Sequence, residues 1–236
     1  MLMVAISCEV SMANTRAQDE ATATLHQLLD YRKSQMGIGA QERIEPEDFF
    51  PVNPKLILKE ILQWDVQAVA MVGHEPTGEE MIAKCIKEER RILLRSGLSD
   101  AVARYTLAHE LAHVRLHSAN HPRSITMLDT SQRDRAVTPS DIEREAEVFA
   151  RELLMPAKAV RLHFMRLFGI SKMRAASDIA ARFAPHAHEE RPVDVRVTAR
   201  EIAECHGSRA TPSLVEFFGV STKSMASRLM GLYLVY

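Results

Sequence analysis

The chain has 236 residues, enough for one domain with an appendage or for two small domains. Its 46% hydrophobic and 26% charged residues are typical of a soluble globular protein, and no run approaches the roughly 18 apolar residues of a transmembrane helix. The three cysteines (Cys8, Cys85 and Cys205) are odd in number and far apart, which argues against a disulfide framework and favours a reducing cytoplasm. We therefore expect a cytoplasmic protein without a membrane partner.

The N-terminal part is predicted to be one helix followed by a linker. Residues 16–36 carry a loose apolar stripe at helical spacing, and Gly37 would end the helix. Residues 40–54 are rich in proline and acidic residues, as linkers often are. We assign residues 1–45 to this N-terminal helix and linker.

Residues 55–63 are predicted to form a short helix, and a small β-sheet should follow it. Three runs at 66–72, 81–86 and 91–95 have the length and apolar content of strands, and turn-forming or charged residues separate them. This sheet would lie just before the most informative stretch of the chain.

That stretch is residues 105–117, which read YTLAHELAHVRLH and contain His109, Glu110 and His113. On a helix, residues four apart lie on one face, so the two histidines can bind one metal ion, at about 2.0–2.1 Å for zinc. Glu110 would flank the ion, where a general base can take a proton from a water. A surface helix with two solvated histidines would look the same, but the apolar flanks indicate a buried helix, whose polar groups need partners.

A second helix is predicted at residues 138–156, TPSDIEREAEVFARELLMP, and it can supply a third ligand. Glu143 and Glu147 lie four residues apart along one edge of its apolar stripe. One carboxylate can complete a three-ligand site, and the other can hold the far nitrogen of a histidine. We favour Glu143 as the ligand and Glu147 as the supporting acid, and we expect Glu145 to be solvated.

The two motifs together resemble the ImmA/IrrE family of metallopeptidases, over roughly residues 50–160. The resemblance implies a gluzincin-like site with zinc ligands His109, His113 and Glu143, and with Glu110 as the catalytic general base. Two positions depart from the family pattern: Ala112 replaces the usual glycine, and Glu147 stands where asparagine or aspartate is common.

A metzincin site does not fit, because Leu116 and Ala119 replace the glycine and the histidine that its pattern requires. His117 lies one further turn along the helix, where it could rim the site but not close it.

The resemblance also implies the surroundings of the site and its substrate. The small sheet should be antiparallel, with an edge strand at residues 91–94 or its neighbour aligning the substrate backbone. Residues 118–137 should form a polar loop at the rim of the cleft. The substrate would be a helix-turn-helix transcriptional repressor or antitoxin, whose cleavage derepresses genes in stress-response or toxin–antitoxin settings.

Beyond residue 156 the chain is predicted to be helical, at 157–168, 171–184 and 197–206. Residues 157–236 hold 12 Lys and Arg against 7 Asp and Glu, a mildly basic excess that is too small to require a nucleic-acid partner. Residues 211–232 resemble a helix-turn-helix, but their second helix offers few bases to DNA. We therefore favour a packing or protein-docking role over DNA binding.

Overall, the sequence predicts an α+β fold that is mainly helical, with a small antiparallel sheet beside a two-helix HExxH zinc site and a helical C-terminal region. The domains would be 1–45, 46–160 for the peptidase, and 161–236. The predicted function is a zinc endopeptidase. The alternatives are a DNA-binding regulator with a structural zinc and a partner that sequesters a repressor, and the base-like position of Glu110 argues against both.

Overall fold

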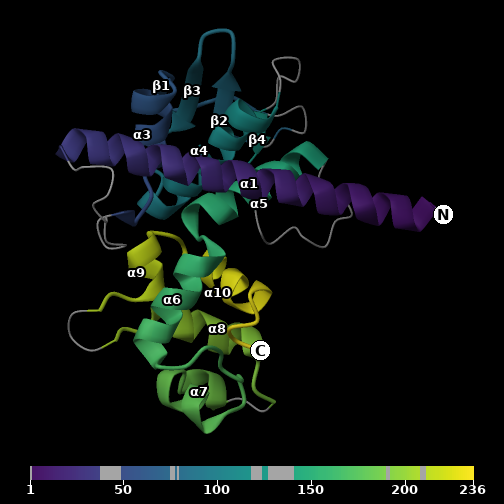
Figure 1. Cartoon of the computed structure of the whole chain (residues 1–236), viewed down its shortest axis with the longest axis vertical. Helices are drawn as coiled ribbons and strands as arrows, with labels where there is room; N and C mark the ends of the chain where they lie inside the picture. Colours follow the sequence, from purple (N-terminus) through teal and green to yellow (C-terminus); the bar gives the residue numbers. More distant parts are fainter. Residues whose placement is uncertain are drawn as a thin grey trace. The chain divides into compact units, whose positions relative to one another are not determined.

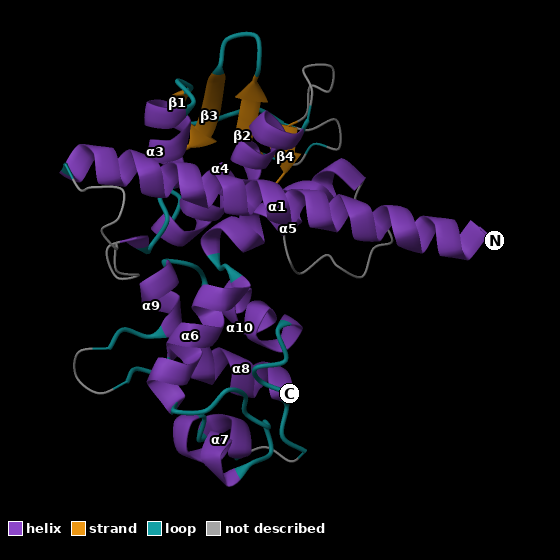
Figure 2. Cartoon of the chain, in the orientation of Figure 1, coloured by secondary structure: helices purple, strands orange, loops and turns teal. Residues whose placement is uncertain are grey.

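The computed structural model describes residues 2–37, 49–74, 78, 80–117, 124–126, 141–189, 192–207 and 211–236. The chain divides into two compact units, one of residues 1–44 and 53–153, the other of residues 45–52 and 154–236. Most described residues are helical, and the strands all belong to the first unit (Figures 1 and 2). No helix in the described ranges combines the length and the hydropathy that crossing a bilayer requires.

The first unit begins with a long helix, α1 (Leu2–Met36), which ends where Gly37 takes a left-handed backbone with φ of 64°. The predicted helix at 55–63 is a short α3 (Pro54–Leu56) that continues as the π-helical turn η1 (Ile57–Ile61). Asn53 caps α3 by accepting the backbone N–H of Leu56. Most of the predicted linker lies outside the described residues.

The sheet consists of β1 (Asp65–Val69), β2 (Met81–Ile86), β3 (Arg91–Arg95) and β4 (Ser124–Thr126), in the order β1-β3-β2-β4. The prediction of an antiparallel sheet is wrong in one pairing, because β1 runs parallel to β3. The tight turn at 87–90 joins β2 and β3 as an antiparallel pair. Strands β1 and β2 are consecutive along the chain but are not neighbours in the sheet, because β3 lies between them.

Two further expectations about the sheet are corrected. Residues 91–94 are not an edge strand, because β3 pairs with β1 on one side and with β2 on the other, whereas the neighbouring strand β1 does lie at an edge. The region 118–137 is not only a loop, since β4 lies within it and pairs antiparallel with β2. The edges of the described sheet are therefore β1 and β4.

Two helices complete the first unit. Helix α4 (Asp100–Leu116) is capped by Ser99, which accepts the backbone N–H of Val102, and it packs against β2 and β3. Helix α5 (Asp141–Leu154) is strongly amphipathic, and the first three residues of its predicted range, 138–140, lie outside the described part. Helix α1 contacts α4 and crosses it in Figure 1. The core that these elements share includes Ile82, Ile92, Leu107, Leu111, Phe149 and Leu153.

The second unit is helical. It contains α6 (Ala157–Phe168), α7 (Asp178–Phe183), the 3-10 turn η2 (His186–His188), α8 (Val195–Glu204), α9 (Leu214–Phe218) and α10 (Thr222–Gly231). The prediction of a helix over 171–184 is wrong in its first half. Met173 and Ala175 donate their backbone N–H groups to Leu234 and Tyr236, so this segment is extended and pairs with the C-terminal residues.

Helices α9 and α10 are joined by a tight turn in which Gly219 is left-handed, with φ of 60°. Of the two bases on α10, Arg228 is buried and its Nε donates to the carbonyl of Met155 at 3.0 Å. Only Lys223 is exposed. With a single exposed basic residue on α10, we still predict a packing or protein-docking role for this pair of helices, not DNA binding.

Candidate metal centre

Helix α4 presents three buried polar side chains in succession along one stretch. His109 is 3% exposed, His113 is 5% exposed and Glu110 is fully buried. The two histidines are four residues apart, and their rings lie one above the other with centroids 4.9 Å apart. Such groups are buried at a cost unless they find partners, so the surroundings of the two rings are informative.

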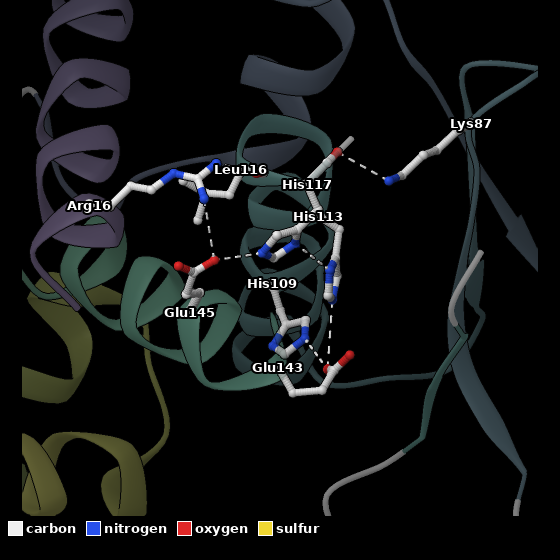
Figure 3. Close-up of polar contacts among 8 residues, drawn as sticks. All are labelled: Arg16, Lys87, His109, His113, Leu116, His117, Glu143 and Glu145. Carbon is white, nitrogen blue, oxygen red and sulfur yellow. Dashed lines mark hydrogen bonds and ion pairs between the residues drawn. The ribbon is translucent and has the colours of Figure 1, made fainter. Parts of the chain in front are cut away.

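Helix α5 brings Glu143 to both histidines (Figure 3). Its Oε2 lies 3.2 Å from Nε2 of His109 and 3.7 Å from Nε2 of His113. One ligand atom from each of the three residues lies within 4.8 Å of the other two. The structure thus brings together the three residues that the sequence predicted as metal ligands.

This arrangement fits a tetrahedral metal ion. Ligand atoms that each lie about 2.0–2.1 Å from one such ion are about 3.3 Å apart, and the two measured separations lie close to this value. Nε2 of His113 is buried without a hydrogen bond from any described residue. Two imidazole nitrogens and a carboxylate are also the donor set of many catalytic zinc sites.

Glu110 differs from the other three because both of its carboxylate oxygens are buried and lack a hydrogen-bond partner among the described residues. Burial, reinforced by the nearby charge of Glu143 and opposed by Lys87, raises the pKa of Glu110 to about 8. Such an acid is costly to keep for structure alone. A divalent cation beside it would favour its ionised form and offset this cost.

The pKa values of the other groups are shifted in different directions. Partial burial acts to raise the pKa of Glu143, but its contacts with His109 and His113 outweigh this and hold it well below the ordinary value. Burial lowers the pKa of His113, which keeps its ring neutral, as metal ligation requires. Two carboxylates with opposite shifts at one site are typical of catalytic centres.

Sequence reasoning placed His117 only at the rim of the site and did not assign Glu145 to it. Nδ1 of His117 lies 3.0 Å from Nδ1 of His113, and its Nε2 lies 3.0 Å from Oε2 of Glu145. Glu145 is 9% exposed, so the expectation that it is solvated is wrong. Arg16 of α1 lies beside it, 3.8 Å from the same oxygen. The four-residue spacing of His113 and His117 could have indicated that their rings meet. The burial of Glu145 beside α1 depends on a distant segment, so the residues near Glu145 could not have indicated it.

Glu147, the acid that was predicted to hold the far nitrogen of a ligand histidine, does not occupy the position that Glu145 has beside His117. Within the described ranges it makes no hydrogen bond or ion pair to a histidine of α4, and its predicted supporting role stays untested by this geometry.

The C-terminal end of α4 is held by two cations. A guanidinium nitrogen of Arg16 donates to the carbonyl of Leu116, and Nζ of Lys87 donates to the carbonyl of His117 at 3.2 Å. Cationic donors satisfy the carbonyls that a helix leaves unpaired at this end. The end of α4 and His117, the residue that follows it, are therefore fixed from both α1 and the β2–β3 turn.

Comparison with protein families matches residues 70–185 to the model described as the IrrE N-terminal-like domain of the Peptidase_M78 family. This confirms the resemblance to the ImmA/IrrE family. The matched range contains β2, β3, α4 and α5, and therefore all the residues of the candidate centre except Arg16. A comparison with curated proteins finds no matching relative.

Proposed function

Residues 70–185 belong to the Peptidase_M78 family, which implies a metallopeptidase, and from this premise we propose that the protein is a zinc-dependent endopeptidase acting on a protein substrate. The observation that supports it best is the meeting of His109, His113 and Glu143 at ligand separations beside the buried, unpartnered Glu110. A purely structural metal site has no use for a free carboxylate at that position.

In this proposal His109, His113 and Glu143 hold the ion. Zinc, when bound by three protein ligands, supplies a Lewis acid that polarises the scissile carbonyl and acidifies a water. Glu110 takes the proton of the attacking water and delivers it to the nitrogen of the leaving amine. Burial makes this carboxylate a stronger base than an exposed glutamate, and a cation beside it would favour the ionised form that accepts the proton.

The donor set favours a transition-metal ion such as zinc over magnesium or calcium. Imidazole nitrogens suit zinc, copper, iron and nickel, whereas magnesium and calcium prefer sites made only of oxygen. With two histidines and one carboxylate, a four-coordinate zinc retains one open position for a water or a substrate.

The substrate follows from family resemblance, not from the geometry of the site. We propose a helix-turn-helix repressor or antitoxin in the cytoplasm, cleaved so that the genes it silences are expressed under stress. An extended substrate segment would add to an edge strand, and the described edges are β1 and β4, not β3.

The test is incubation of the purified protein and zinc with purified helix-turn-helix repressors from the same genome. We expect two fragments of constant size, and none with the zinc-free protein or with His113→Ala. The control is His186→Ala, because that histidine is largely exposed and lies in the second unit. A repressor that forms a stable complex with the zinc-loaded protein but stays intact would instead favour the sequestration alternative.

A further inference from the structure

A line of polar contacts continues from the candidate centre toward the N-terminal helix (Figure 3). Nδ1 of His113 lies 3.0 Å from Nδ1 of His117, and Nε2 of His117 lies 3.0 Å from Oε2 of Glu145. Nη1 of Arg16 lies 3.8 Å from the same carboxylate oxygen. The line therefore joins three helices, α4, α5 and α1.

Only one placement of hydrogens satisfies this line. Nε2 of His113 faces Glu143, where the ion would lie, so it must be free of hydrogen, and the hydrogen of the neutral ring is on Nδ1. His113 then donates to Nδ1 of His117, which must accept and therefore carries its own hydrogen on Nε2. His117 donates that hydrogen to the carboxylate of Glu145. Every donor in the line meets an acceptor.

The line is also shielded from water. The side chains of His117 and Glu145 are 6% and 11% exposed, so water competes little with their hydrogen bond. The ring of His117 lies 5.0 Å from that of His113, which restricts how either ring can turn. A carboxylate in such a place is costly without partners, and here it has a histidine and an arginine.

We propose that His117 and Glu145 are positioning residues, which fix the hydrogen of His113 on Nδ1 and hold its ring with Nε2 toward the metal, and that Arg16 anchors them from α1. This rests on the proposed function, because it assumes that His113 is a ligand. Hydrogen bonds to the far nitrogen of a ligand histidine raise its basicity and set its orientation.

Arg16 extends this line of polar contacts beyond the matched domain. Helix α1 precedes residue 70, and Arg16 also donates to the carbonyl of Leu116 at the end of α4. The N-terminal helix therefore supports both this line of polar contacts and the end of α4, which His117 directly follows.

The test compares two acids of the same helix, Glu145→Gln and Glu147→Gln, by their affinity for zinc alone. Affinity is measured by competition with a chromophoric chelator, and the absorption spectrum of the cobalt-substituted proteins reports the ligand geometry. Loss of a partner of a ligand histidine typically costs 10–100-fold in metal affinity. We expect about tenfold weaker binding for Glu145→Gln, 10–100-fold for His117→Ala, and no change for Glu147→Gln.

A conservative variant separates positioning from packing. In His117→Asn the side-chain oxygen can stand near the position of Nδ1 and accept from His113, so we expect this variant to recover much of the affinity that His117→Ala loses. The double variant of His117→Ala and Glu145→Gln should lose no more than His117→Ala, because Glu145 acts through His117. Thermal unfolding of the metal-free proteins identifies any variant that fails to fold, and Glu145→Gln, with its near-equal volume, then carries the comparison.

The outcomes separate the two proposals. If the wild-type protein binds zinc and Glu145→Gln binds it as tightly as the wild type does, the positioning role of His117 and Glu145 is overturned and the zinc site stands. Additive losses in the double variant would overturn it as well. If the wild-type protein binds no zinc, the proposed function and the positioning role are both overturned.

Discussion

The substitution Glu110→Gln separates catalysis from structure at one residue. The amide has nearly the same size as the carboxyl and can still form a hydrogen bond, but it cannot accept a proton at neutral pH. Because Glu110 is not one of the three clustered ligand residues, we expect the variant to keep its metal. General-base catalysis typically contributes 10²–10⁴-fold to a rate, so cleavage of the repressor should fall by about that factor.

The metal-free protein provides a second measurement of the same residue. The folded-state pKa of Glu110 is raised to about 8 from an ordinary value near 4.5, so its neutral form favours the folded state below pH 4.5. This advantage is lost as the pH rises through 8. The glutamine does not titrate, so Glu110→Gln should gain stability over the wild type by roughly 3 kcal/mol between pH 5 and pH 8.

Both effects can be followed in simple assays. Co-expression with the repressor that the cleavage test identifies reports cleavage by the loss of the full-length band, and metal analysis of the purified variant reports retention of zinc. Urea unfolding of the chelator-treated proteins at pH 5 and pH 8 reports the stability difference. Equal loss of the repressor band with wild type and Glu110→Gln would refute the general-base role, and an unchanged stability difference between the two pH values would refute the buried, raised-pKa carboxyl.

Three further outcomes follow from the same geometry. Glu143→Ala should empty the metal site while Glu147→Ala leaves it filled, as metal analysis of the purified variants would show; the opposite result would reverse the assignment. The protein should bind duplex DNA weakly and lose it at modest salt, because Arg228 is buried and Lys223 is the one exposed basic residue of α10; tight binding at physiological salt in a titration would contradict this. Phe149→Ala should lower the free energy of unfolding by about 3–5 kcal/mol in urea titrations, because this ring is fully buried in the core of the first unit; a loss below about 1 kcal/mol would show that the core collapses around the space.

Several features of the site follow from sequence periodicity alone. An α-helix has 3.6 residues per turn, so the four-residue spacing of His109 and His113 places them on one face wherever the helix packs. The apolar stripe of residues 141–154 likewise predicts a buried helix with an acid along its edge. Local caps behave in the same way, since Ser99 and Asn53 act on backbone groups only three residues away.

The strands show where periodicity stops being sufficient. The positions of β2 and β3 were predicted from their apolar runs, and the four-residue turn between them allows only an antiparallel pair. The partner of β1 was not predicted, because nothing in residues 65–69 states which edge of the hairpin they join. Its parallel pairing with β3 makes β3 a central strand and moves the open edge elsewhere.

The sequence by itself determined which residues could share a face: two histidines on one helix and a row of acids on the next. Only the tertiary structure decided that Glu143 meets the histidines and that Glu145 is buried with His117. The reason is physical. Helical periodicity fixes the angle between side chains of one helix, but the side that becomes buried depends on which distant segment covers it. Here that segment is α1, whose Arg16 lies beside Glu145 and closes the last turn of α4.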